Sequence, residues 1–274
     1  MKNAMMWMTA LILIVILTAG GCASNIDLVA IENYSIAVES GDTVWFTMQA
    51  GRVSFTGTED GEIEISGTAT GEIIWEETDN GVEITVERTG SRAEQTGQEL
   101  EVKIPKGIIL DISTYDADII LENITGQVKA VSVAGDVTAS RLAGDIFLKS
   151  GRGNVQATAC QGHVRVLGEH GILRMIDLHG DIASGTIMGT VDFTGSIGEG
   201  DEVFLETDHG PVLVTLYKPM SMEVKAWTAS GEVACMVAGL AQTVDGCVGL
   251  VGDGVPGKLT VKTVSGKIWM ETAP

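Results

Sequence analysis

Between residues 126 and 198 the hydrophobic and polar positions recur every nine residues, and a glycine opens each unit. The glycines are Gly126, Gly135, Gly144, Gly153, Gly162, Gly171, Gly180, Gly189 and Gly198. Counted from each glycine, positions +2 and +4 are mostly aliphatic, as in Val128 and Ala130, whereas polar residues such as Asp136 and Arg165 lie between them. This alternation predicts a half-buried β-strand of about five residues in every unit.

A repeat of odd length must change parity once per unit, and turn residues such as Ser132, Ser150 and Asp177 lie where the change falls. Nine residues leave no room for a crossover helix, so parallel pairing requires that the strands wind as a coil. We therefore predict an all-β fold, a parallel β-solenoid (β-helix) of nine-residue strand–turn units. An antiparallel meander competes with it, but the junctions lack Asn-Gly or Asp-Gly hairpin turns.

Two coil lengths fit the repeat, one of two units (about 18 residues) and one of three units (about 27 residues). A spacing of three units places small residues in one column, which favours the longer coil: Ala130, Ala157 and Ser184.

The repeat divides the chain into four predicted parts. Residues 1–21 form a signal peptide, 22–31 a tether, 32–105 a looser β-rich acidic part or cap, and 106–274 the solenoid. In 32–105 alternating strands remain, with glycines at a ten-residue period. A cap is expected there, because an exposed terminal strand invites edge-to-edge association.

The N-terminus has the pattern of a bacterial lipoprotein signal. Lys2 precedes an apolar run from Met5 to Leu17, and small residues then lead to Cys22. We predict cleavage before Cys22 and acylation of this cysteine, palmitate included, which would hold the mature chain outside the cytoplasm on a membrane. An uncleaved membrane anchor is the alternative, since about 18 apolar residues could span a bilayer.

Three further cysteines follow. Cys160 occupies an inward repeat position and is expected to be a small, inert core residue. Cys235 and Cys247 bracket a short loop and either remain free or form a disulfide in an oxidising compartment.

The chain is acidic, with 37 Asp and Glu against 17 Lys and Arg, a formal charge of −20. Residues 32–101 alone hold 16 acidic and 3 basic residues. Nucleic acid is therefore excluded as a partner, because phosphate binding needs a basic face. A solvated acidic surface is the simplest interpretation.

Short motifs along the chain resemble a known family. One motif is the segment Leu100–Pro105 followed by Lys106, and another is the Ala-Gly-Asp-Val or Ala-Gly-Asp-Ile unit that begins at Ala134 and Ala143. Together they resemble the bacterial putative-adhesin domain family, which is related to the head domain of auto-transporter adhesins. The resemblance covers roughly residues 30–272. It implies a cell-envelope β-solenoid, often a lipoprotein, and brings no catalytic residues.

No catalytic motif was found in the sequence, and neither a cofactor nor a metal is expected. His170 and His179 each precede a repeat glycine and should point outward on units that cannot share a ladder. Regular calcium binding is disfavoured, since an aspartate follows the repeat glycine only at Asp136, Asp145 and Asp181.

These patterns predict a lipid-anchored, extracytoplasmic adhesin or interaction scaffold that is not an enzyme. Its partners would be the membrane and a surface protein or glycan. An envelope-stress sensor that binds a regulatory partner is the first alternative. A carbohydrate-active β-helix enzyme is the second, with Asp145, Arg165 and Asp181 as residues that one face could gather.

Overall fold

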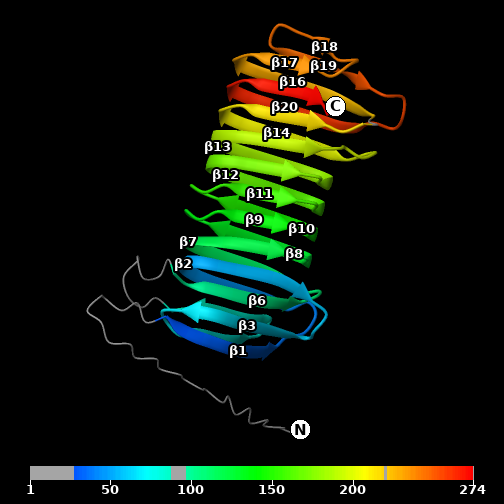
Figure 1. Ribbon diagram of the computed structural model, residues 1–274. Helices are drawn as coiled ribbons and strands as arrows, with labels where there is room; N and C mark the ends of the chain where they lie inside the picture. Colours follow the sequence, from blue (N-terminus) through cyan, green and yellow to red (C-terminus); the bar gives the residue numbers. More distant parts are fainter. Residues whose placement is uncertain (1–27, 88–96, 219–220, 274) are drawn as a thin grey trace, which may run out of the picture.

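The computed structural model describes residues 28–87, 97–218 and 221–273 (Figure 1). These residues form 21 β-strands that belong to one hydrogen-bonded sheet. The predicted all-β class is therefore confirmed. The described residues contain no helix that is long and apolar enough to cross a membrane.

Seven strands form the region of the nine-residue repeat, and they lie in two walls. The strands are β7 (Ile109–Glu122), β8 (Thr125–Ser132), β9 (Val137–Ser140), β10 (Ala143–Ser150), β11 (Val155–Thr158), β12 (Gln161–Ile176) and β13 (His179–Gly195). We call residues 109–114, 127–132, 145–150, 163–168 and 181–186 wall A, and residues 119–122, 137–140, 155–158, 173–176 and 191–195 wall B. Successive repeat units alternate between the walls.

Each repeat strand pairs in parallel with the strand two units further along the chain. Thr125 lies beside Ala143 in wall A, and Val137 lies beside Val155 in wall B. The pairing offset is therefore two units and not three. The predicted column of small residues at a spacing of three units has no structural counterpart, because residues at that spacing lie in opposite walls.

The predicted β-solenoid is wrong. Six parallel strands close into a barrel, since β7 pairs with β8 and β9, β12 pairs with β10 and β11, and the two columns between them are continuous. The remaining strands lie outside this ring, and several of them are antiparallel. The period and the alternation of the sequence predict where the strands lie and which side of each strand is buried. They do not predict that the ring closes, which happens because β7 and β12 each run unbroken through both walls.

The N-terminal strands continue both walls below β7. They are β1 (Val29–Ala37), β2 (Thr43–Thr58), β3 (Glu62–Ala69), β4 (Ile73–Thr78), β5 (Gly81–Val86) and β6 (Glu99–Pro105). Strand β2 pairs in parallel with β7 on one side, and with β5 and then β6 on the other. The outer strands β4, β3 and β1 are added in antiparallel pairs.

At the C-terminal end the strands stack out of sequence order. They are β14 (Glu202–His209), β15 (Val212–Leu216), β16 (Met222–Ser230), β17 (Val233–Met236), β18 (Ala241–Gln242), β19 (Gly246–Val251), β20 (Gly257–Ser265) and β21 (Ile268–Thr272). Strand β20 lies between β14 and β16, and β21 lies between β15 and β17. The last two strands of the described chain are thus inserted below β16–β19, which cap the stack in Figure 1.

The core follows the predicted inward positions closely. Every residue at +2 and +4 of the first eight units is buried, from Val128 and Ala130 to Val191 and Phe193. Position −2 is buried in some units and exposed in others. Leu142 is buried, whereas Val133 and Ile187 are 42% and 51% exposed, because the chain turns the corner from wall A to wall B at that point.

Buried hydroxyl groups line this corner and fix its backbone. Ser150 donates to the carbonyl of Gly135 at 2.8 Å and accepts the N–H of Gly153 at 2.9 Å. Ser184 is also buried, in wall A, yet its hydroxyl has no hydrogen-bond partner among the described residues. A serine-to-alanine substitution can therefore be compared at two buried positions, one with a hydrogen-bonded hydroxyl and one with an unpaired hydroxyl.

Ser150→Ala is expected to lower the free energy of unfolding by about 1–3 kcal/mol, because a buried carbonyl and a buried N–H each lose a partner. Ser184→Ala is expected to leave it unchanged or to raise it by about 1 kcal/mol, since an unpaired hydroxyl no longer needs to be desolvated. Urea unfolding followed by circular dichroism measures both. Equal losses in the two variants would contradict this assignment.

Candidate functional site

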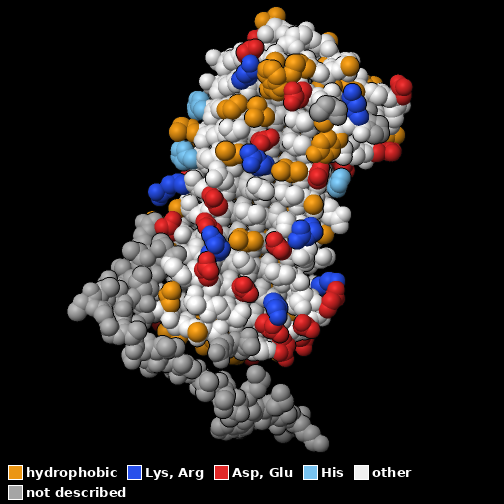
Figure 2. Space-filling view, in the orientation of Figure 1, with side chains coloured by type: hydrophobic (Ala, Val, Ile, Leu, Met, Phe, Trp, Pro, Cys, Tyr) orange, Lys and Arg blue, Asp and Glu red, His pale blue; other side chains and the backbone are white. Residues whose placement is uncertain are grey.

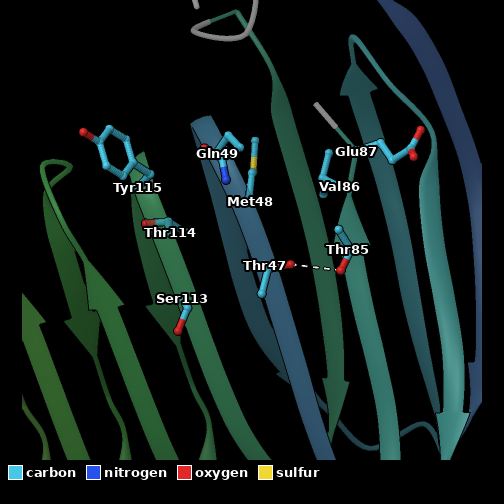
Figure 3. Close-up of a pocket in the computed structure, with 9 residues that line it drawn as sticks. All are labelled: Thr47, Met48, Gln49, Thr85, Val86, Glu87, Ser113, Thr114 and Tyr115. Carbon is cyan, nitrogen blue, oxygen red and sulfur yellow. Dashed lines mark hydrogen bonds between the residues drawn. The ribbon is translucent and has the colours of Figure 1, made fainter. Parts of the chain in front are cut away.

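A surface hollow with a volume of about 480 Å³ lies where β2, β5 and β7 run side by side (Figure 3). Nine residues line it, three consecutive residues each from within β2, from within β7 and from the end of β5: Thr47, Met48, Gln49, Ser113, Thr114, Tyr115, Thr85, Val86 and Glu87. Its volume falls within the range of about 300–1,000 Å³ that ligand sites occupy. It is an open depression in the surface and not an enclosed cavity.

The hollow forms because one of its three strands stops. Strands β2 and β7 continue side by side around the corner, where Ala50 pairs with Asp116, but β5 ends at Val86. Outward side chains of the two continuing strands therefore face a gap beside the end of β5. The alternation of the strands then places Met48, Val86 and Thr114 inward and their neighbours along the chain outward.

The floor of the hollow carries a row of hydroxyl groups. Thr47 pairs with Thr85 on one side and with Ser113 on the other, and the Oγ1 atoms of the two threonines are 3.0 Å apart. The row above it holds the exposed side chains of Gln49, Glu87 and Tyr115. Figure 3 shows all three at the upper end of the site.

The lining of the hollow includes no lysine or arginine and a single carboxylate, that of Glu87. Hydroxyl, amide and phenol groups can both donate and accept hydrogen bonds. A phosphate or sulfate group would find no counter-charge there. The site therefore suits a neutral ligand that carries hydroxyl or amide groups.

The sequence pattern does not distinguish the residues that line the hollow. Thr47, Thr85 and Ser113 are ordinary outward positions of alternating strands, and they become neighbours only through the pairing of β2 with both β5 and β7. The sequence contained no signal for this, because residues 43–86 lack the nine-residue period.

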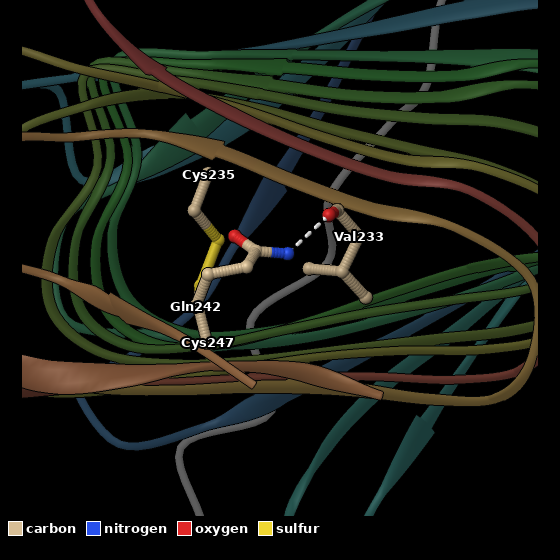
Figure 4. Close-up of a disulfide and its surroundings, with 4 residues drawn as sticks. All are labelled: Val233, Cys235, Gln242 and Cys247. Atoms are coloured by element: carbon tan, nitrogen blue, oxygen red, sulfur yellow. Dashed lines mark hydrogen bonds between the residues drawn. A yellow bond between two sulfur atoms is a disulfide. The ribbon is translucent and has the colours of Figure 1, made fainter. Parts of the chain in front are cut away.

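The cysteines lie in three settings. Cys22 lies outside the described residues. Cys235 of β17 and Cys247 of β19 are joined by a disulfide that links the two walls at the cap (Figure 4). Beside it, the Gln242 amide donates to the carbonyl of Val233 at 2.7 Å. Cys160 is fully buried and free, and burial raises the pKa of its thiol.

The aspartates considered for calcium or catalysis act elsewhere in the structure. Asp136 accepts the backbone N–H of Asn154 at 2.7 Å, and Asp181 accepts that of Glu202 at 3.0 Å. Both carboxylates thus hold the next strand of the stack. Asp181 also lies 3.3 Å from Nδ1 of His163, and the pairing places Asp145 on the other side of this histidine.

The other candidates differ in where they lie. Arg165 lies on the same outward face of wall A as Asp145 and Asp181, in the next column along the strands, beside Phe147 and Ala183. His170 pairs with Met188 where the chain leaves wall A, whereas His179 pairs with Gln161 where the chain enters wall A. The two histidines therefore lie at different corners. The described chain brings no three His, Cys, Asp or Glu residues into a metal-binding group.

Charged side chains form ion pairs on the outer face of β14, β20 and β16, which continue wall A beyond β13. Lys258 pairs with Glu202, and Lys225 pairs with Glu223 at 2.8 Å. The hydrogen bond that Lys258 donates to Glu202 raises the pKa of Lys258, and the hydrogen bond that Lys225 donates to Glu223 lowers the pKa of Glu223. These exposed groups balance one another in charge, so these two lysines offer no unpaired charge to an anionic ligand.

Comparisons with known proteins point to one group of solved structures. No family model matches the chain, and no curated protein matches it either. A putative adhesin from Bacteroides fragilis is similar over 88% of this chain and 96% of its own, with 13% identity and a TM-score of 0.50. The likeness shows that the chain shares the fold of that protein.

Two further structures are similar over nearly their whole length. A putative cell adhesion protein from Clostridium sporogenes has 15% identity over 88% of this chain and 99% of its own, with a TM-score of 0.31. A putative adhesin from Parabacteroides merdae has 13% identity over 89% and 96%, with a TM-score of 0.29.

Proposed function

We propose that the chain is an adhesin-like binding module of the cell surface, without enzymatic activity and held at the envelope by acylation of Cys22. The observation that carries this is the fold that it shares with the putative adhesin of Bacteroides fragilis. The chemistry of the surface supports it, because the described residues present a hollow lined by hydrogen-bonding groups.

The arrangement of the strands suits a tethered module. Strand β1 lies at one end of the stack and the cap of β16–β19 at the other (Figure 1). A chain attached through its N-terminus would therefore hold β1 towards the membrane and the cap away from it. The walls between them would be open to a partner from the side.

The hollow between β2, β5 and β7 is the proposed contact site. Its hydroxyl row and the exposed Gln49, Glu87 and Tyr115 match a neutral glycan, which presents hydroxyl groups together with flat apolar ring faces. Aromatic side chains contribute a large rigid contact area with one polar atom at the tip, which suits such ligands.

One experiment tests the anchor and the contact site together. Cells that express the full chain, Cys22→Ser, or the triple variant Thr47→Val, Thr85→Val and Ser113→Ala are compared for adhesion to glycan-coated surfaces. Cys22→Ser is expected to release the protein from the membrane fraction and abolish adhesion. The triple variant is expected to remain on the membrane and to lose adhesion at least tenfold, because it keeps the shape of the hollow but removes its hydroxyl groups.

Thr260→Val is the matched control, since Thr260 lies half-buried on the same wall but far from the hollow. It should adhere like the unaltered chain. If the unaltered chain adheres to no neutral glycan surface, the proposed function is wrong. If the triple variant adheres normally, only the proposed contact site is wrong.

A further inference from the structure

Three metal-ligating side chains become neighbours at the corner between the walls. His170 of β12 pairs with Met188 of β13, and Met188 pairs with His209 of β14. All three are exposed, and the Met188 side chain is 51% exposed. At one edge of the molecule, Figure 2 shows two histidine side chains with a hydrophobic side chain between them.

This arrangement depends on a break in the repeat. From β12 to β13 the pairing offset is two repeat units, because Val164 pairs with Ile182. From β13 to β14 the offset is three residues longer, because Ile182 pairs with Val203. An unbroken period would place Glu206 beside Met188. Three extra residues before β14 place His209 there instead.

The spacing of the strands allows the three side chains to share one ion. Neighbouring strands lie about 4.8 Å apart, so the two histidine backbones are separated by roughly 10 Å with Met188 midway. Imidazole rings that lean inward from both sides can therefore reach an ion placed over the thioether sulfur, at the usual nitrogen–metal distance of about 2 Å.

The donor set selects the ion. A thioether is a soft ligand that favours monovalent copper, and imidazole also binds copper well. Glu169 and Asp208, which directly precede the two histidines, add negative charge, and Lys149, at 3.3 Å from Glu169, and Arg152, in the layer below His170, offset it. Oxygen-binding ions such as Ca²⁺ and Mg²⁺ find no set of carboxylates here.

We propose that His170, Met188 and His209 form a surface site for one Cu(I) ion. The site is independent of the hollow, which lies on other strands of the stack. It involves no change in the oxidation state of the metal, so it requires neither an oxidant nor a reductant.

The test uses the full chain in detergent, with Cu(I) kept reduced by ascorbate and supplied in competition with bicinchoninate. Ag(I) serves as a redox-inert probe. One ion per chain is expected, together with a shift of the Met188 methyl resonance on addition of Ag(I). Met188→Leu keeps the size of the side chain and should weaken binding at least tenfold, as should His170→Gln and His209→Gln.

Met236→Leu is the matched control, because Met236 is also 51% exposed and lies on β17. Its affinity should equal that of the unaltered chain, and any background from other sulfur ligands is common to both variants. An unchanged Cu(I) affinity in Met188→Leu, or a Met188 methyl resonance that Ag(I) leaves unmoved, would overturn the proposal. Zn²⁺ bound more tightly than Ag(I) would overturn the assignment to a soft ion.

Discussion

Gly162→Ala is expected to lower the free energy of unfolding by about 3–5 kcal/mol, which is a large part of the stability of a typical domain. Two costs combine at this position. Gly162 has a φ of +113°, which L-residues rarely adopt. A Cβ atom there would also lie 2.3 Å from the carbonyl oxygen of Gly144, one layer below.

Backbone atoms cause this clash, so no side chain can move aside to relieve it. Gly144 and Gly180 repeat the geometry, since a Cβ on each would lie 2.1 Å and 2.4 Å from the carbonyl oxygen of the glycine one layer before it. The nine-residue glycine period therefore serves the close approach of successive strands at the corners. Gly144, Gly162 and Gly180 are each needed because a backbone carbonyl of the layer below leaves no room for a Cβ atom.

Two other glycines separate the contributions. Gly41 has a φ of +97°, but a Cβ there would have no atom within 4 Å, so Gly41→Ala should cost only about 1–2 kcal/mol. Gly61 also has open space and no left-handed φ, and Gly61→Ala should be neutral or slightly stabilising. Chemical unfolding of the three variants gives the comparison. A loss in Gly162→Ala no larger than that in Gly41→Ala would contradict the clash.

The inner face of the repeat could be predicted from the sequence because it depends only on local alternation. Val128 to Val191 at +2 and Ala130 to Phe193 at +4 are all buried as expected. Position −2 shows the limit of that reasoning. Leu142 and Ile187 occupy the same position of the repeat and are both aliphatic. Leu142 is buried and Ile187 is exposed because they lie at different corners, which the repeat does not distinguish.

The closure of the strands could not be predicted in the same way. Each nine-residue unit is compatible with several partners, and the choice of offset depends on which strands run unbroken through both walls, as β12 does from Gln161 to Ile176. The β-solenoid prediction failed at this level. It treated every unit as a separate strand and so could not foresee that the ladder returns on itself.

Both proposed sites depend on non-local pairing. The hollow needs β2 to lie between β5 and β7, and the His170–Met188–His209 cluster needs the longer offset before β14. Neither residue set has a sequence motif. Even for the short loop between Cys235 and Cys247 the sequence left two outcomes open, free thiols or a disulfide, and the structure contains the disulfide.

The inserted C-terminal strands explain how the cap is held. Among the described residues, β16 and β17 join the other parallel strands only through β20 and β21. The disulfide ties β17 to β19, but both of these strands belong to the cap itself. The attachment of the cap therefore depends on residues that follow it in the chain.

Deletion of residues 257–274 is expected to detach the cap and to remove roughly 6–12 kcal/mol of apolar stabilisation. Four side chains of these strands are buried, each at 1% exposure or less: Leu259, Val261, Ile268 and Met270. Each contributes about 1.5–3 kcal/mol when fully buried. Hydrogen exchange should show rapid exchange of residues 221–251, while β8 to β13 remain protected.

Met270→Ala tests the same contact in a chain of full length. A cost of about 2–5 kcal/mol is expected, with exchange raised first in β16–β19. Val264→Ala is the control, because Val264 also belongs to this C-terminal insertion but is 43% exposed, and it should cost less than about 0.5 kcal/mol. Full protection of residues 221–251 in the deleted chain would show that the cap is held by contacts other than β20 and β21.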